Sequence, residues 1–140
     1  MSEIVLDASV ALAWAFPDEG SEYADAVLVS LEGETILVPG LWAIEVTNGL
    51  AVGERRKRLR GAEIRRFLAL LEGLPIFQDV LSPGDAVKGT LPLAREYGLS
   101  AYDAAYLELA VRKGAPVATL DIGLRKAARE AGVPVFTGRR

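Results

Sequence analysis

Short apolar runs alternate along this chain with longer stretches of helical periodicity, and this alternation limits the possible folds more than any other feature. We expect strands at residues 4–7, 35–38, 76–80, 117–120 and 134–137. We expect helices at residues 22–31, 41–54, 62–71, 83–96, 102–113 and 123–131. The run Ile4-Val5-Leu6 is apolar at every position, as in a strand that is buried on both faces. The sequence therefore predicts a three-layer α/β/α sandwich around a mainly parallel central sheet.

The length and composition are those of one globular unit. A chain of 140 residues is a common size for a compact domain, and no linker divides it, so we expect residues 1–140 to form a single domain. Hydrophobic residues make up 51% of the chain and charged residues 25%. The first apolar runs are separated by Asp7 and lack a basic leader, so we expect no export, no membrane insertion and a cytoplasmic protein.

The chain contains no Cys and no His, which restricts the chemistry that it can perform. Thiolate nucleophiles, imidazole acid–base catalysis and most transition-metal sites are removed. A reactive site must therefore use oxygen atoms. The formal net charge of −3 gives no overall attraction for nucleic acid, so a phosphate substrate would need a local basic patch or a bound cation.

Two acids follow predicted strands. Asp7 lies between apolar residues with Ser9 two positions later, and Asp121 has Thr119 two positions before it. Functional crevices of open α/β sheets lie beyond the carboxyl ends of the strands, so these two strand ends could present oxygen ligands to one point. The alternative for both acids is a helix cap that accepts backbone N–H groups.

Two further acids lie in predicted helices. Asn48 shares a helical face with Glu45 and could bond its carboxylate, a water or a substrate. The alternative is a solvent-facing pair on an amphipathic helix. Asp103 lies in a first helical turn with Ser100 as a potential cap, where the helix dipole alone would favour an acid.

The combination of Asp7, Glu45, Asp103 and Asp121 favours a functional site over four separate structural roles. All four stand in apolar contexts, and three stand at strand ends or helix starts. Gathered in one place they would repel, so some would hold protons or a divalent cation would bind. Oxygen ligands favour Mg²⁺ or Mn²⁺.

Four blocks of this sequence resemble the PIN-domain ribonucleases, and most of all the VapC-type toxins of toxin–antitoxin pairs. The blocks, in the family's order and approximate spacing, are Asp7-Ala8-Ser9, Glu45-Val46 with Asn48, Ser100-Ala101-Tyr102-Asp103-Ala104 and Ala118-Thr119-Leu120-Asp121. The resemblance covers nearly the full length. It implies a parallel α/β/α fold and RNA cleavage dependent on Mg²⁺ or Mn²⁺, with the four acids as ligands and Ser9, Asn48 and Thr119 in support. It also implies a homodimer and a cognate antitoxin whose tail covers the active site.

A basic run could bind RNA phosphates near the acids, although a solvated loop is an equal alternative. It consists of Arg55, Arg56, Lys57 and Arg58, with Arg60 beyond it. The stripe of apolar side chains on the helix at residues 62–71 could be core or a groove for a partner.

Several other side chains are interpreted as structural. Aromatic residues in apolar contexts are more often core than stacking platforms for bases. This applies to Trp14, Trp42, Tyr102 and Tyr106. We expect the acids Asp18, Glu19, Glu32, Glu34 and Glu108 to be exposed to solvent. No substrate role is assigned to Arg112 and Lys113, which end a helix where cations suit the dipole.

Two other classes of function remain open at this point. A receiver module also gathers acids around Mg²⁺, but it needs an adjacent acidic pair near the first strand and a coupled Lys, whereas Asp7 stands alone. A non-catalytic binding module with the same fold could use the same acids.

Overall fold

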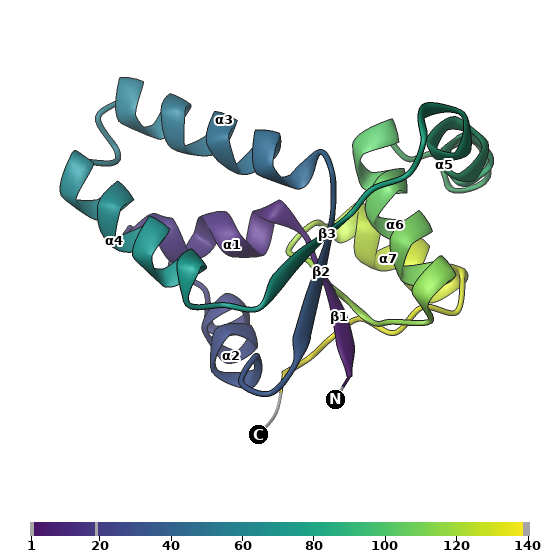
Figure 1. The fold of residues 1–140 in the computed structure, drawn as a ribbon, viewed down its shortest axis with the longest axis horizontal. Coiled ribbons are helices and arrows are strands. Elements are labelled where there is room, and N and C mark those ends of the chain that lie inside the picture. The colour runs from purple at the N-terminus through teal and green to yellow at the C-terminus, as the bar shows by residue number, and fades with distance from the viewer. Residues whose placement is uncertain (1, 19, 139–140) are drawn as a thin grey trace.

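A computed structural model describes residues 2–18 and 20–138 of the chain (Figure 1). Strands and helices alternate along it largely as predicted. The elements are β1 (Glu3–Leu6), α1 (Ala8–Ala15), α2 (Glu22–Ser30), β2 (Thr35–Pro39), α3 (Trp42–Arg55), α4 (Gly61–Glu72), β3 (Ile76–Asp79), α5 (Pro83–Tyr97), α6 (Ala101–Lys113), β4 (Val117–Ala118) and α7 (Ile122–Glu130). No helix within the described residues is long and apolar enough to span a lipid bilayer.

The strands form one parallel sheet in the order β3-β2-β1-β4. Val5 of β1 lies opposite Leu37 on one side and Val117 on the other. Figure 1 shows this sheet between α1, α3 and α4 on one side and α5, α6 and α7 on the other, with α2 beneath α1. The predicted three-layer α/β architecture is confirmed, since parallel strands need helical crossovers that cover both faces.

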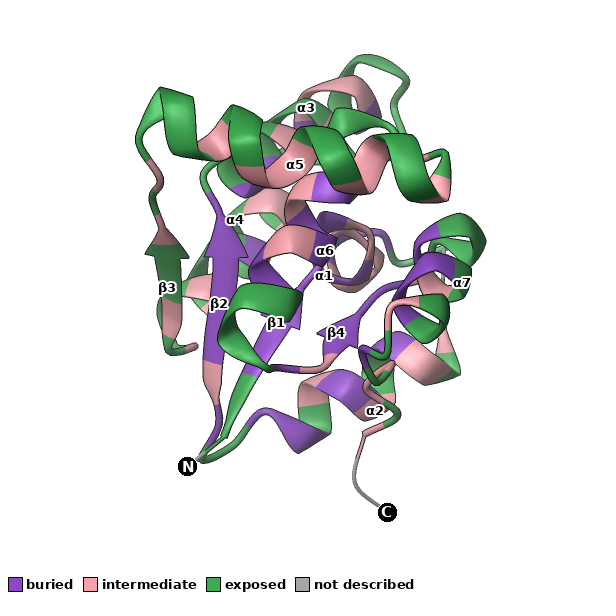
Figure 2. Cartoon of the chain, turned by 90° about the vertical axis from the view of Figure 1, so that its right-hand side faces the viewer, coloured by how far each residue is buried: buried purple, intermediate pink, exposed green. Residues whose placement is uncertain are grey.

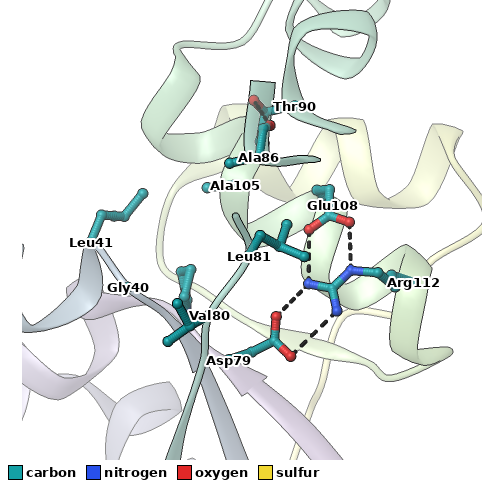
Figure 3. Close-up of a pocket in the computed structure, with 11 residues that line it drawn as sticks. Gly40, Leu41, Asp79, Val80, Leu81, Ala86, Thr90, Ala105, Glu108 and Arg112 are labelled. Atoms are coloured by element: carbon teal, nitrogen blue, oxygen red, sulfur yellow. Dashed lines mark hydrogen bonds and ion pairs between the residues drawn. The ribbon is translucent and has the colours of Figure 1, made fainter. Parts of the chain in front are cut away.

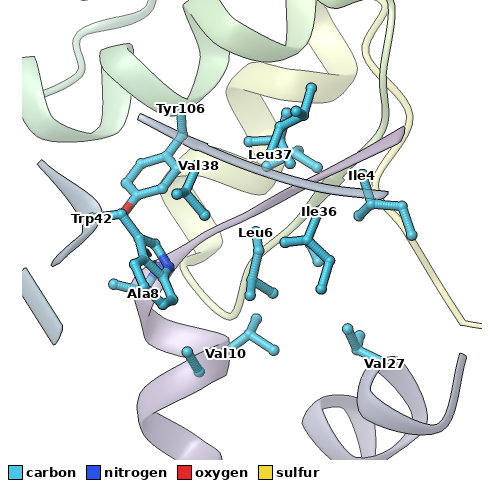
Figure 4. Close-up of a cluster of buried hydrophobic side chains, with 14 of the residues drawn as sticks. Ile4, Leu6, Ala8, Val10, Val27, Ile36, Leu37, Val38, Trp42 and Tyr106 are labelled. Atoms are coloured by element: carbon cyan, nitrogen blue, oxygen red, sulfur yellow. Dashed lines mark hydrogen bonds between the residues drawn. The ribbon is translucent and has the colours of Figure 1, made fainter. Parts of the chain in front are cut away.

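The core is formed by the central strands and the helices on both sides of them. Figure 2 shows β1, β2 and β4 as largely buried. Leu6 and Ile36 are each 0% exposed and lie in one apolar cluster with Val10 of α1 and Val27 of α2 (Figure 4). Burial of each such aliphatic side chain stabilises the folded state by about 1.5–3 kcal/mol, so the central strands are held firmly in place.

Two elements differ from the sequence prediction. Helix α1 was not among the expected helices, because its segment is apolar nearly all round and shows no helical stripe. The expected strand at residues 134–137 is reduced to an isolated parallel bridge between Val117 and Val135. Its neighbour β4 has only two residues, and Pro134 has no N–H to donate, so a regular ladder does not develop.

Two expected surface acids are not exposed: Glu34 is buried and Glu108 is partly buried. Glu34 is only 5% exposed, and the hydroxyl of Ser2 donates to its carboxylate. Glu108, which was expected to face solvent, lies under α5 with a side chain that is 12% exposed. A Cβ at Gly89 would stand 3.0 Å from the Glu108 Cγ, so the small residue on α5 makes room for this carboxylate. Glu19 lies outside the described residues.

Arg112 joins α6 to the edge strand β3. Its Nη2 lies 2.5 Å from Asp79 Oδ2, and its Nε lies 2.7 Å from Glu108 Oε2 (Figure 3). These three side chains line a pocket of about 230 Å³ beside β3, α5 and α6. The Arg112 hydrogen bonds lower the pKa of Asp79. The Arg112 guanidinium thus bridges two carboxylates, and Lys113 Nζ lies 3.8 Å from the Asp79 carboxylate, so α6 is joined to the edge of the sheet.

We predict that Arg112→Met destabilises the protein at neutral pH by about 1.5–3 kcal/mol, the range for hydrogen bonds to charged groups. Because the folded-state pKa of Asp79 is lowered, its contribution is present above the unfolded pKa and is lost as pH falls through the folded value. Urea unfolding at neutral pH and at about pH 3 should show the difference from wild type shrinking in acid. Arg95→Met on the exposed face of α5 is the control, and equal unfolding midpoints for all three proteins would contradict the prediction.

Candidate functional site

The four predicted acids line a single pocket of about 340 Å³. It lies at the carboxyl ends of β1 and β4, where α1, α3, α6 and α7 begin. Its lining consists of Asp7, Ala8, Ser9, Leu12, Glu45, Asn48, Gly49, Asp103 and Asp121. The parallel register explains why Asp7 and Asp121 meet. Leu6 of β1 pairs with Ala118 of β4, so the segments that follow the two strands leave the sheet at the same edge. Thr119, the remaining candidate, is fully buried behind Asp7.

Asp7 is only 6% exposed and is held by two hydroxyl groups. Ser9 Oγ donates to Asp7 Oδ2 at 2.7 Å, and Thr119 Oγ1 donates to the same oxygen at 2.6 Å. The capping alternative is wrong for this side chain, because Asp7 precedes α1 but makes no side-chain cap bond. Burial raises the pKa of Asp7 and the two hydroxyls oppose that shift, while the charge of Asp121 adds to it. The Asp7 carboxylate is therefore buried and oriented by hydrogen bonds, and its charged form is disfavoured by its surroundings.

Asp121 does act as a helix cap. Its Oδ2 accepts the backbone N–H of Leu124 at 2.7 Å at the start of α7. Its own backbone N–H donates to Thr119 Oγ1 at 3.0 Å. The cap fixes one carboxylate oxygen of Asp121 at the rim of the pocket, so capping and a place in the pocket are compatible for this residue.

Glu45 stands on the first turn of α3 and reaches across to α6. The hydroxyl of Tyr106 donates to Glu45 Oε1 at 2.6 Å, and the backbone N–H of Ala8 donates to the Tyr106 hydroxyl at 3.3 Å. Burial raises the pKa of Glu45, and the Tyr106 hydrogen bond opposes the shift. Asn48 lies exposed one turn later and lines the same pocket.

Asp103 experiences the charge of the whole pocket. Its backbone N–H donates to Ser100 Oγ at 3.1 Å, which confirms the predicted cap of α6. Partial burial, followed by repulsion from Asp121, Asp7 and Glu45, raises the pKa of Asp103 to about 6. The charges of all three other acids raise the pKa of Asp103, so the four carboxylates interact electrostatically as one group.

The donor set fits a hard divalent cation in its chemistry. In the described part of the chain, no three acidic side chains already form a cation-binding group. Three of the four carboxylates instead accept hydrogen bonds from the protein, namely Asp7, Glu45 and Asp121. Oxygen donors of this kind suit Mg²⁺ or Mn²⁺, and a cation would relieve the repulsion that raises the Asp103 pKa.

The basic run lies at the far end of α3 and does not line the pocket. Arg58 is engaged locally, with Nη2 3.8 Å from Asp18 and its guanidinium 4.7 Å above the Phe16 ring centroid. The side chains of Arg55, Arg56 and Lys57 are exposed. The run therefore stands apart from the acids, ten residues from Glu45 along one helix.

Most of the aromatic candidates are part of the core, as expected, and one is not. Trp42 and Tyr106 are buried, and the Trp14 indole N–H donates to the Ala24 carbonyl at 2.8 Å. Tyr102 is 62% exposed beside Asp103. The contact between Tyr106 and Glu45 was missed, although Tyr106 follows Asp103 by three residues and so shares its side of α6.

Fold and pocket together define a parallel α/β/α protein with an all-oxygen site at its strand ends. The family model for the PIN domain matches residues 4–130. The chain is 37% identical over 120 residues to Ribonuclease VapC3 of Pyrobaculum aerophilum, covering 85% of this chain and 89% of that protein. The chain belongs to the PIN domain family, as the resemblance predicted.

Solved structures agree with this assignment. PAE2754 from Pyrobaculum aerophilum is 29% identical, with a TM-score of 0.66 over 91% of this chain and 87% of that one. VapBC2 from Rickettsia felis, solved bound to a DNA fragment from its promoter, has a TM-score of 0.64 over 96% of this chain and 97% of that one. At 14% identity the second likeness shows the fold alone.

We predict that Asp103→Asn stabilises the cation-free protein at pH 8 by on the order of 1 kcal/mol, discounted for partial solvation of the carboxyl. Because the folded-state pKa of Asp103 is raised, the protonated carboxyl favours the folded state. This contribution to the free energy of unfolding is fully present below the unfolded pKa and is lost as pH rises through about 6. Urea unfolding in chelator at about pH 4 and pH 8 measures this. Asp25→Asn on exposed α2 is the control, and the same pH dependence in Asp103→Asn and wild type would contradict the prediction.

Proposed function

We propose that this chain is a metal-dependent endoribonuclease of the VapC kind, the toxin of a toxin–antitoxin pair, and that residues 1–140 act as one domain in the cytoplasm. Membership of the PIN domain family and the similarity to Ribonuclease VapC3 support the reaction. The observation that carries the proposal is the meeting of four carboxylates in one pocket of a chain that has no His or Cys.

The side chains divide the work by their position. Asp7, Asp103 and Asp121 would hold Mg²⁺ or Mn²⁺, and Glu45 would be a further ligand or a base. The chemistry supplied by a bound cation would be polarisation of the phosphoryl group and a lower pKa of an attacking water. Ser9 and Thr119 keep the Asp7 carboxylate oriented by their two hydrogen bonds. The Asn48 side-chain amide can donate a hydrogen bond to a phosphate oxygen or a water.

We predict that Asp7→Asn abolishes metal-dependent RNA cleavage and leaves the protein folded. The substitution preserves side-chain shape but removes a negative charge that the cation requires. Cleavage of a single-stranded RNA pool is measured with Mg²⁺, with Mn²⁺ and with chelator, and folding by circular dichroism. Asp25→Asn on the exposed face of α2 should cleave like wild type.

Two results of this assay would decide against the proposal. Full activity of Asp7→Asn would show that the pocket is not the reacting site. Mn²⁺ binding without any RNA cleavage by the wild type would favour the alternative of a non-catalytic binding module.

The cationic end of α3 gives RNA a place to bind outside the acidic pocket. Glu45 and Arg55 are separated by ten residues of continuous helix, which is about 15 Å along its axis. Exposed guanidinium groups at that distance would hold phosphates a few nucleotides from the cleaved bond. Attraction is thereby supplied locally in a chain whose net charge is −3.

We predict that Arg55→Gln/Arg56→Gln raises KM for RNA, leaves kcat unchanged and flattens the salt dependence of binding. For each phosphate that the variant no longer binds, the slope of log K against log salt should fall by about 0.7 for single-stranded RNA. Fluorescence anisotropy with a labelled RNA at several salt concentrations measures the slope. Lys88→Gln/Arg95→Gln on α5 removes the same charge elsewhere, and an equal effect of both pairs would point to net charge alone.

Protein partners are part of the same proposal. Kinship with the VapC-type toxins favours a homodimer and a cognate antitoxin that covers the active site. Ile44 and Tyr102 are 71% and 62% exposed and directly precede Glu45 and Asp103, so a partner that covers the pocket would meet these two side chains as well.

A further inference from the structure

Tyr106 is the buried side chain that connects most of the acid-bearing segments. It lies on α6 one turn after Asp103, and its side chain is 0% exposed. Figure 4 shows its ring within the apolar cluster. Its hydroxyl meets the N–H of Ala8, directly after Asp7, and the carboxylate of Glu45 on α3. One phenol therefore joins α1, α3 and α6 behind the pocket.

The direction of the two hydrogen bonds is fixed by their donors. A backbone N–H can only donate, so the phenol oxygen accepts from Ala8 and its single proton is directed to Glu45 Oε1. The Ala8 N–H belongs to the first turn of α1, where N–H groups have no partner within the helix. Consecutive hydrogen bonds polarise one another, so the bond from the Ala8 N–H to the Tyr106 hydroxyl strengthens the bond from that hydroxyl to Glu45.

Such support matters for Glu45 because of the length of its side chain. It is the one Glu among them, and its carboxylate moves about one more side-chain bond than an Asp carboxylate. Asp7 is held by two hydroxyls and Asp121 by a backbone N–H. With Oε1 bonded to Tyr106, Oε2 is the oxygen that Glu45 can offer to the pocket.

We propose that Tyr106 is a positioning residue that sets the Glu45 carboxylate for cation binding, a role that rests on the metal-dependent function proposed above. A buried Tyr hydroxyl must have some hydrogen-bond partner, and a purely structural role would be satisfied by any acceptor. The two roles predict different results when Tyr106 and Glu45 are substituted together. Only a positioning role makes the effect of Tyr106 on cation affinity depend on Glu45.

The test is a double-mutant cycle on Mn²⁺ binding, followed without RNA by the electron paramagnetic resonance signal of free Mn²⁺. Tyr106→Phe should weaken Mn²⁺ binding by about 10–100-fold, the usual effect of removing a group that orients a metal ligand. Glu45→Gln should weaken it as well, and adding Tyr106→Phe to Glu45→Gln should cost little more. Tyr23→Phe, which removes a hydroxyl that donates to the Phe136 carbonyl, should bind like wild type.

The outcomes that would contradict the two proposals are distinguishable. Wild-type affinity in Tyr106→Phe, or equal losses from Tyr106→Phe with and without Glu45, would overturn the positioning role while the nuclease proposal stands. Equal Mn²⁺ affinity of wild type and Asp7→Asn would overturn the metal site itself.

A second measurement avoids substituting Tyr106. Mg²⁺ should perturb the tyrosine ultraviolet spectrum in a Tyr23→Phe/Tyr102→Phe background, which removes the ring that interacts with the charge of Asp7 and the exposed ring beside the pocket. The change should vanish when Glu45→Gln is added. No Mg²⁺-dependent change in the Tyr23→Phe/Tyr102→Phe protein would overturn the inference.

Discussion

The buried carboxylate of Asp7 is the constraint on which the rest of the site depends. A carboxylate at 6% exposure would be costly without partners, and Ser9 and Thr119 supply two hydroxyl donors. The same hydroxyls accept backbone N–H groups from Leu120 and Asp121. One oxygen of the Asp7 carboxylate therefore links the end of β1 to the segment after β4. The hydroxyls that stabilise the buried Asp7 carboxylate also position Asp121 at the pocket.

The four like charges are partly offset by the helices that begin around them. Asp7 and Asp121 precede α1 and α7, while Glu45 and Asp103 lie in the first turns of α3 and α6. Each helix N-terminus carries about half a positive charge, so four of them offset about two of the four carboxylates. Burial and the remaining repulsion between the carboxylates together raise the pKa of Asp103. Dipole complementarity and the gathering of the acids in one pocket, which compete as explanations of the sequence, therefore occur together.

The layout of the chain could be predicted because its patterns are local. Apolar strands and Gly-stopped helices indicated the parallel sheet, and the parallel sheet implied that acids after β1 and β4 would meet. Helix α1 escaped because a segment that is apolar all round has no periodicity to detect. The burial of Glu108 depends on Arg112 of its own helix and on Asp79 from β3, 29 residues earlier in the sequence, which no local pattern contains. The bond from Tyr106 to Glu45 likewise requires knowing how α6 crosses α3.

Helix α3 carries both an acid of the pocket and the start of the basic run in a chain of net charge −3. Glu45 stands in its first turn and Arg55 in its last turn, where each charge suits the helix dipole, while a second acid, Glu54, stands beside Arg55. About 15 Å of helix separates Glu45 from Arg55, which exceeds the Debye length of about 8–10 Å at physiological salt. Under the proposed function, screening would keep the acids from cancelling the attraction of the basic side chains for RNA. The pocket is partly buried and screened less, so added salt would act mainly on RNA capture and only slightly on the pocket carboxylates.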